Sequence, residues 1–166
     1  MFHIAFFIEF SEVMMHNSIQ EYHLLLIQDL RQEQTVCLNA ATYSIGRDSS
    51  NAIVIDDPTV SRQHCLLIRV PVNHHRYIYR IVDGDISGLR SKNGFQVNQR
   101  SYSEKILETQ DKVQVGAYTT LSYMIANMTA PEFEHFFGMT ILPFHTVKEE
   151  IMDPTGTLNF GDPQCA

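Results

Sequence analysis

The most regular feature of the chain is a succession of short apolar segments between residues 22 and 126. Several of them alternate apolar and polar residues, as residues 76–82 (RYIYRIV) do, and this period of two is typical of strands with one buried face. No helical apolar stripe interrupts the series, so the pattern predicts an all-β, mainly antiparallel sandwich. The segments expected to form strands are 22–30, 34–39, 42–47, 51–56, 65–70, 76–83, 94–98, 112–116 and 119–125.

The last forty residues have a different composition. Four of the six prolines and three of the eight glycines lie there, together with more phenylalanine than a solvated linker usually carries. The segment 132–137 (EFEHFF) predicts a short helix, and the rest of this tail is expected to be poorly regular. The predicted organisation is therefore an N-terminal extension (1–21), a β domain (22–126) and a C-terminal extension (127–166).

Charge and cysteine usage exclude several classes of protein. The formal charge of −7 is unevenly spread, because residues 21–126 carry eleven charges of each sign whereas residues 127–166 carry six acids against Lys148. A neutral body with an acidic tail argues against a protein built to bind duplex DNA. No segment approaches the roughly 20 apolar residues that span a bilayer. Cys37, Cys65 and Cys165 fit neither a disulfide framework nor a zinc site, so we expect a cytoplasmic protein with reduced thiols, no metal and no cofactor.

Two polar motifs at the ends of predicted strands carry candidate chemistry. In Gly46-Arg47 the glycine permits close backbone approach and the arginine projects from a loop, although an isolated arginine is most often simply solvated. In the motif at residues 61–64 (SRQH), Ser61 and His64 suggest a nucleophile with its base, or an anion site in which Ser61 donates and Arg62 adds charge. Nothing in the sequence orients His64 or supplies an oxyanion hole, so the catalytic interpretation is weak. For His64 a loop-bracing role is preferred.

The third motif is residues 91–94 (SKNG), which precede the predicted strand 94–98. Asn-Gly tolerates positive φ at both positions and predicts a hairpin turn between two strands. The Asn93 side chain combines a donor and an acceptor in one planar group, which suits pairing with a peptide backbone.

Taken in this order and spacing, the motifs IGR (45–47), SRQH (61–64), SKNG (91–94) with VN (97–98), and DKVQVG (111–116) resemble the forkhead-associated (FHA) domain family. The resemblance covers about residues 22–126. It implies a sandwich of two twisted, mainly antiparallel sheets that binds phosphothreonine peptides through loops at one end. Two departures are Phe95, where many members have threonine, and residues 99–111, which lack the usual leucine-rich, glycine-containing loop.

The resemblance also implies a role for each matching residue. Arg47 and Ser61 correspond to phosphate ligands, and Arg62 and Lys92 stand where members often place further phosphate-contacting groups. Asn93 corresponds to the asparagine that holds the peptide main chain. The loop-supporting positions are Gly46, His64, Gly94 and Asn98.

The function expected from the resemblance is a non-enzymatic, phosphothreonine-binding adaptor. Its partner would be a Thr-phosphorylated protein or peptide, such as a Ser/Thr kinase or its substrate, with no nucleic acid and no membrane insertion. Because the chain holds little beyond one such domain, we expect a bacterial protein. The alternative is a phosphate-independent scaffold that uses its C-terminal tail, and self-association through the tail is a further hypothesis.

Overall fold

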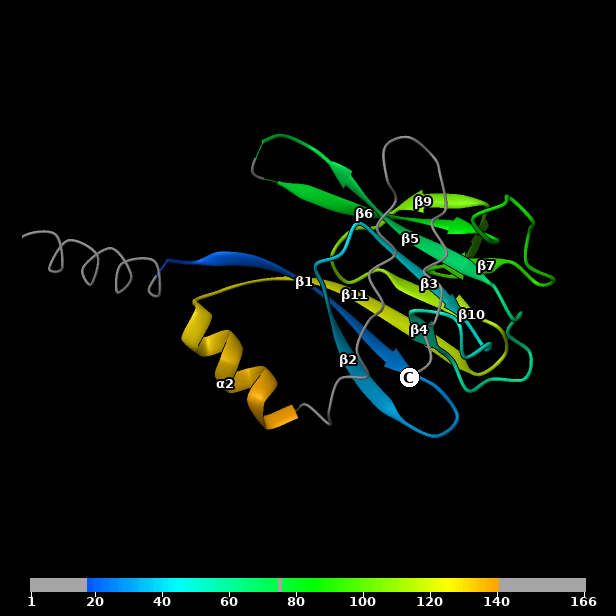
Figure 1. Ribbon diagram of the computed structural model, residues 1–166, viewed down its shortest axis with the longest axis horizontal. Helices are drawn as coiled ribbons and strands as arrows, with labels where there is room; N and C mark the ends of the chain where they lie inside the picture. Colours follow the sequence, from blue (N-terminus) through cyan, green and yellow to red (C-terminus); the bar gives the residue numbers. More distant parts are fainter. Residues whose placement is uncertain (1–17, 75, 141–166) are drawn as a thin grey trace, which may run out of the picture.

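Two sheets packed face to face form the body of the molecule (Figure 1). The computed structural model describes residues 18–74 and 76–140. The six-stranded sheet has the order β2 (Glu33–Leu38), β1 (Gln20–Gln28), β11 (Thr119–Met128), β10 (Lys112–Val115), β7 (Phe95–Val97) and β8 (Arg100–Tyr102). The five-stranded sheet has the order β4 (Ile53–Val54), β3 (Thr42–Gly46), β5 (Cys65–Pro71), β6 (Tyr77–Asp83) and β9 (Glu104–Ile106).

Strand pairing confirms the predicted mainly antiparallel sandwich. Neighbouring strands run antiparallel except β3 and β4, which are parallel. Alternation along the strands directs one side of each sheet inward, and a shift of register by one residue would turn every apolar side chain outward. The inward side chains form one core, which includes Leu25, Ile27, Ile45, Leu67, Tyr79, Ile81, Val113, Val115, Leu121 and Tyr123.

Two strands were missed in the sequence analysis, and one prediction about local structure was wrong. Strands β8 and β9 were not predicted, because each is three residues long and none of their six side chains is buried. The predicted hairpin at Asn93-Gly94 is absent, since β6 and β7 belong to different sheets and the segment between them crosses from one sheet to the other. Gly94 alone of the pair has a positive φ, +64°.

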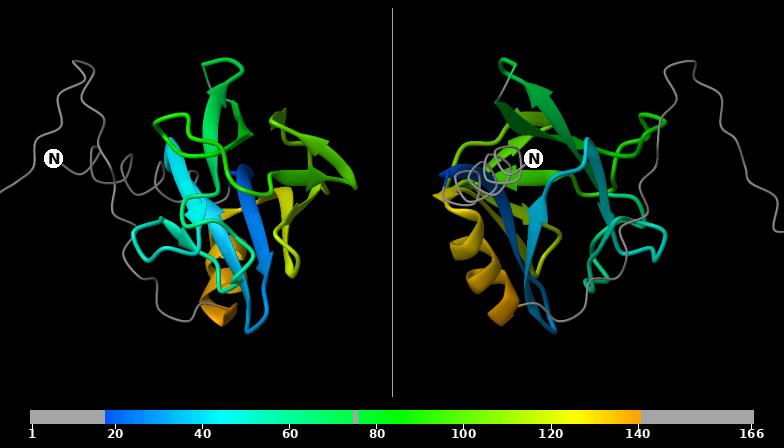
Figure 2. Two further views of the ribbon diagram at one scale, coloured as in Figure 1. Left: turned by 90° about the vertical axis from the view of Figure 1, so that its right-hand side faces the viewer. Right: turned by 60° about the vertical axis from the view of Figure 1, so that its left-hand side comes forward.

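A helix, α2 (Ala130–Thr140), follows β11 and contains the predicted helical segment 132–137. Thr129 caps it: the Thr129 backbone N–H and hydroxyl both donate to Glu132 Oε2, at 2.8 and 2.9 Å. The Phe133 ring stacks on Tyr22 of β1 at 4.1 Å, and Phe137 is buried. The helix therefore covers the outer face of the six-stranded sheet (Figure 2, right). Neither α2 nor any other helix in the described residues has the length and apolarity needed to cross a membrane.

The loops that carry the three sequence motifs gather at one end of the sandwich. In Figure 1 the segments 47–52, 55–64 and 84–94 lie at the right-hand end, and the left panel of Figure 2 faces that end. Helix α2 and the start of β1 lie toward the other end. The strand ends therefore place the candidate site at one edge of the molecule.

Candidate functional site

The end of β3 lies directly against the second motif. The Arg47 N–H donates to the Ser61 carbonyl at 3.1 Å, and the Asp48 N–H donates to the Arg62 carbonyl at 3.2 Å. This approach requires a glycine at position 46, because an added Cβ would lie 2.2 Å from the Arg62 oxygen. The buried Asn51 amide also donates to that oxygen, at 2.7 Å. The first and second motifs are thus held together by backbone contacts.

His64 joins the second motif to the third. Its ring is fully buried, with Nδ1 accepting the Ser61 N–H at 3.0 Å and Nε2 placed 2.9 Å from the Gly94 carbonyl. Since Nδ1 accepts, the proton is on Nε2 and donates to Gly94. Burial lowers the pKa of His64, which favours this neutral form.

The same contacts contradict the catalytic interpretation of Ser61 and His64. Both ring nitrogens of His64 are engaged by backbone groups, and neither bonds the Ser61 hydroxyl. A general base must reach the proton that it removes. His64 is therefore not placed to activate Ser61.

Lys92 and Asn93 complete the contact between the loops. The Lys92 N–H donates to Ser61 Oγ at 3.0 Å, which leaves the hydroxyl hydrogen of Ser61 able to donate to a ligand. The Asn93 amide donates to the Thr59 carbonyl at 2.9 Å. This bond uses one amide hydrogen and leaves the second hydrogen and the Oδ1 atom for a peptide main chain.

Asp57 and Thr59 brace the site, although the sequence analysis did not single them out. Thr59 Oγ1 accepts the N–H of Ala117 at 2.7 Å, and Asp57 Oδ2 accepts the N–H of Tyr118 at 2.9 Å. Burial raises the pKa of Asp57, but hydrogen bonds from Thr59, Tyr118 and Thr119 outweigh it and the pKa is lowered. The signal in the sequence was Asp57-Pro58-Thr59, a turn in which the aspartate accepts the N–H of the residue two positions on.

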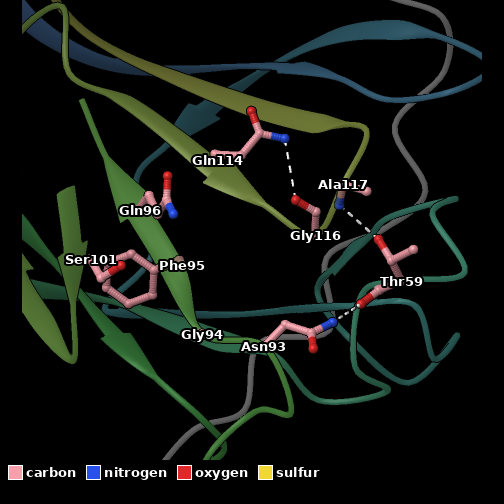
Figure 3. A pocket seen from close by; sticks show the side chains of 9 residues that line it. All are labelled: Thr59, Asn93, Gly94, Phe95, Gln96, Ser101, Gln114, Gly116 and Ala117. Carbon is pink, nitrogen blue, oxygen red and sulfur yellow. Dashed lines mark hydrogen bonds between the residues drawn. The ribbon is translucent and has the colours of Figure 1, made fainter. Parts of the chain in front are cut away.

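A groove of about 370 Å³ opens beside Asn93 (Figure 3). The buried Phe95, 3% exposed, lies between this groove and the core, so the residue that departs from the family pattern helps to form the groove. Both Asn93 and Thr59 line the groove, and a dashed line in Figure 3 marks the hydrogen bond between them. The lining residues are Thr59, Asn93, Gly94, Phe95, Gln96, Ser101, Gln114, Gly116 and Ala117.

Four cationic side chains of these loops are exposed: Arg47, Arg62, Arg90 and Lys92. None of them forms an ion pair with a carboxylate elsewhere in the described part of the chain. Hydrogen bonds from Ser50 lower the pKa of Asp48, and the charges of Arg62 and Arg47 lower it further. The end of the sandwich thus combines unpaired positive charge with fixed hydrogen-bond donors.

Asn98 lies apart from this cluster, at the far end of β7 from Gly94. It has a positive φ of 49°, donates to Asp111 Oδ1 at 2.7 Å and accepts the Lys112 N–H at 3.0 Å. It therefore ties the β7–β8 turn to the start of β10. The structure brings together the other predicted site residues, which are Gly46, Arg47, Ser61, Arg62, His64, Lys92, Asn93 and Gly94.

Binding and catalytic residues often lie on loops that a rigid scaffold positions, as the strand-joining loops of this sandwich are positioned at one end. Comparison with known proteins gives the family: the FHA domain matches residues 43–116, and the chain belongs to this family. FHA domains bind phosphothreonine peptides and usually have no catalytic activity.

Individual relatives are less informative about function. The Slr1951 protein from Synechocystis sp. is 34% identical, with a TM-score of 0.59 over 61% of this chain and 96% of that one. The uncharacterized Synechocystis protein sll1895 is 38% identical over 78 residues, which are 47% of this chain and 11% of that protein. The present chain therefore spans about a tenth of that relative's length.

A second solved structure, from a study of phosphothreonine-dependent FHA domain interactions, is 22% identical with a TM-score of 0.52. It covers 63% of this chain and 97% of its own. This likeness concerns the fold alone. Together with the likeness to the Slr1951 protein, it confirms the predicted FHA-like sandwich.

Proposed function

We propose that this chain is a non-catalytic phosphothreonine-peptide-binding adaptor. In this proposal Arg47 and Ser61 hold the phosphate, Arg62 and Lys92 add positive charge, and Asn93 holds the peptide main chain. The observation that carries the proposal is that hydrogen bonds at Ser61 join its own loop to the two others. The Ser61 carbonyl accepts the Arg47 N–H, its N–H donates to His64, and its hydroxyl oxygen accepts the Lys92 N–H.

The chemistry of the ligand matches these donors. A phosphothreonine carries about −1.5 to −2 charges at neutral pH and three strong acceptor oxygens. The planar guanidinium of Arg47 suits two phosphate oxygens, whereas the Ser61 hydroxyl offers one directed donor and the Lys92 ammonium a mobile charge. Because hydrogen bonds already fix the loops, little conformational entropy would be lost on binding.

The central test is Arg47→Ala. Each charge-assisted hydrogen bond contributes roughly 1.5–3 kcal/mol, so the variant should bind a phosphothreonine peptide about tenfold to a hundredfold more weakly. Calorimetric titration with the phosphopeptide and its unphosphorylated twin measures the change. A pull-down from native lysate, with and without phosphatase, would supply the natural peptide and show whether the partner is a Ser/Thr kinase or a kinase substrate.

Arg76→Ala is the matched control. Arg76 is also an exposed arginine, but it lies on the hairpin between β5 and β6, at the opposite end of the sandwich. Its Nη2 atom pairs with Oε2 of Glu21 in β1 at 3.2 Å. Its loss changes the net charge equally and should leave binding unchanged. Equal binding of the phosphorylated and unphosphorylated peptides by the folded wild-type chain would refute the proposed function.

A further inference from the structure

The loop of residues 84–90 displays two large apolar side chains to solvent at the end of the sandwich that carries the proposed site. Ile86 is 64% exposed and Leu89 is 72% exposed. The left panel of Figure 2 shows this loop projecting beside the other site loops. Exposed apolar side chains that cluster on one loop often mark an interaction surface.

Hydrogen bonds fix the conformation of this loop. Asp85 Oδ1 accepts the N–H groups of Ser87 and Leu89, each at 2.9 Å, and the Ser87 hydroxyl at 2.6 Å. The Asp85 N–H donates to the Leu89 carbonyl at 3.0 Å. At Gly84, with φ +100°, an added Cβ would lie 2.4 Å from that carbonyl. The two apolar side chains are thus presented on an ordered frame, which lowers the entropic cost of binding through them.

This loop is continuous with the proposed phosphate site but lies outside the groove. At one end the Gly84 N–H donates to the His64 carbonyl at 2.8 Å, and at the other the Lys92 N–H donates to Ser61 Oγ. None of residues 84–92 lines the groove, which begins at Asn93 on this segment. On this segment of the chain, therefore, Lys92, which is proposed to contact the phosphate, lies between the exposed pair Ile86 and Leu89 and the groove residues that begin at Asn93.

We propose that Ile86 and Leu89 bind an aliphatic or aromatic side chain of the phosphorylated partner, on the side of the phosphothreonine that the groove does not hold. This inference rests on the proposed function. The occupant is a phosphorylated segment, because the exposed cations Arg90 and Lys92 adjoin the apolar pair and match a phosphate next to an apolar residue. Ile86 and Leu89 are then specificity-determining residues for this site.

The test is a positional scan with synthetic phosphothreonine peptides. One leucine is moved through the three positions on each side of the phosphothreonine in an otherwise Ala/Ser background, and each peptide is titrated against the full chain. The wild type should prefer leucine about threefold to tenfold at one or two positions, all on one side. The double variant Ile86→Ser/Leu89→Ser should lose this preference and keep its affinity for the all-Ala/Ser phosphopeptide.

Leu30→Ser is the matched control, since Leu30 is 55% exposed on the β1–β2 hairpin, away from this loop. It should retain the leucine preference. The inference is overturned if the wild type shows no positional preference, or if the double variant keeps it. In both of these outcomes phosphate-dependent, Arg47-dependent binding survives, whereas failure of the proposed function removes phosphate dependence from every peptide.

Discussion

His64 is the side chain that fixes the second and third loops relative to each other. It does so only when neutral, because Nδ1 must accept the Ser61 N–H while Nε2 donates to Gly94. Burial lowers its pKa from the ordinary value of 6.5. The unfolded chain therefore takes up a proton at a higher pH than the folded chain does.

This difference predicts a loss of stability in mild acid. Between the ordinary pKa near 6.5 and the lower folded pKa, the unfolded state binds more protons, so the free energy of unfolding falls as the pH falls through this window. Thermal unfolding of the unliganded chain at pH 7.5 and 5.5 should show a lower midpoint at pH 5.5. The buried His23, whose pKa burial also lowers, adds to the effect.

The variant His64→Gln isolates the contribution of His64. Glutamine can donate and accept but does not titrate, so its midpoint should change less between the two pH values. An identical change in wild type and variant would contradict the assignment to His64. Measuring the chain without ligand matters, because phosphothreonine itself gains a proton near pH 6.

The site residues that the sequence revealed are those that belong to motifs recognisable by their order and spacing. Arg47 and Asn93 belong to recognisable motifs, and the structure brings their loops together. Asp57 and Thr59 were missed because their partners are backbone N–H groups of Ala117 and Tyr118, about sixty positions along the chain. A backbone N–H exists at every residue except proline, so no pattern in the sequence marks such a partner.

Helix α2 is attached to the sandwich by a small aromatic cluster. Phe133 stacks on Tyr22 and lies 4.4 Å from the ring of Phe137, which is 2% exposed. Tyr22 and the buried Leu24 point away from the core, since the alternation of β1 places Leu25 inside it. The helix thus shields apolar side chains on the outer face of β1.

Phe137→Ala should therefore destabilise the chain by about 3 kcal/mol, because removing a buried phenylalanine forfeits its transfer energy and leaves a cavity. Urea unfolding monitored by circular dichroism measures this. Phe136→Ala, on the same helix but 48% exposed, is the matched control and should cost less than about 1 kcal/mol. Equal effects of the two substitutions would contradict this packing, and phosphopeptide affinity should change in neither.

The strands found from the sequence are those with apolar residues at alternate positions, such as β6, where Tyr79 and Ile81 enter the core. The three-residue strands β8 and β9 carry no such pattern, and their pairing with β7 and β6 supplies their structure. Asn93-Gly94 was assigned to a hairpin because a tight turn has the same local chemistry whether it returns to the same sheet or crosses to the other. Only long-range pairing distinguishes the two.

The chain as a whole combines an electrically neutral body with acidic residues outside the described part. Residues 141–166 contain four acids and Lys148, a net charge of −3. These acids would repel a phosphopeptide, but charges are screened over about 8 Å at physiological salt. Every residue proposed to contact the phosphate or the peptide main chain lies between Arg47 and Asn93, and the groove beside them ends at Ala117. In the proposed function the last 26 residues therefore contribute no essential ligand contact.

A chain shortened to residues 1–140 should consequently bind a phosphothreonine peptide within about twofold of the full chain at 0.15 M salt, and Arg47→Ala should weaken binding equally in both. Shortening the chain at Asn127 would be a poorer test, because it also removes α2 and uncovers Tyr22 and Leu24. Calorimetry gives the affinities, and light scattering gives the oligomeric state of each chain.

The tail-dependent scaffold is the better description if two results occur together. The full chain self-associates even after phosphatase treatment whereas the shortened chain does not, and the shortened chain binds no phosphopeptide. Phosphate-dependent binding that persists without residues 141–166 places the activity in the loops of the sandwich, where Arg47, Ser61 and Lys92 meet.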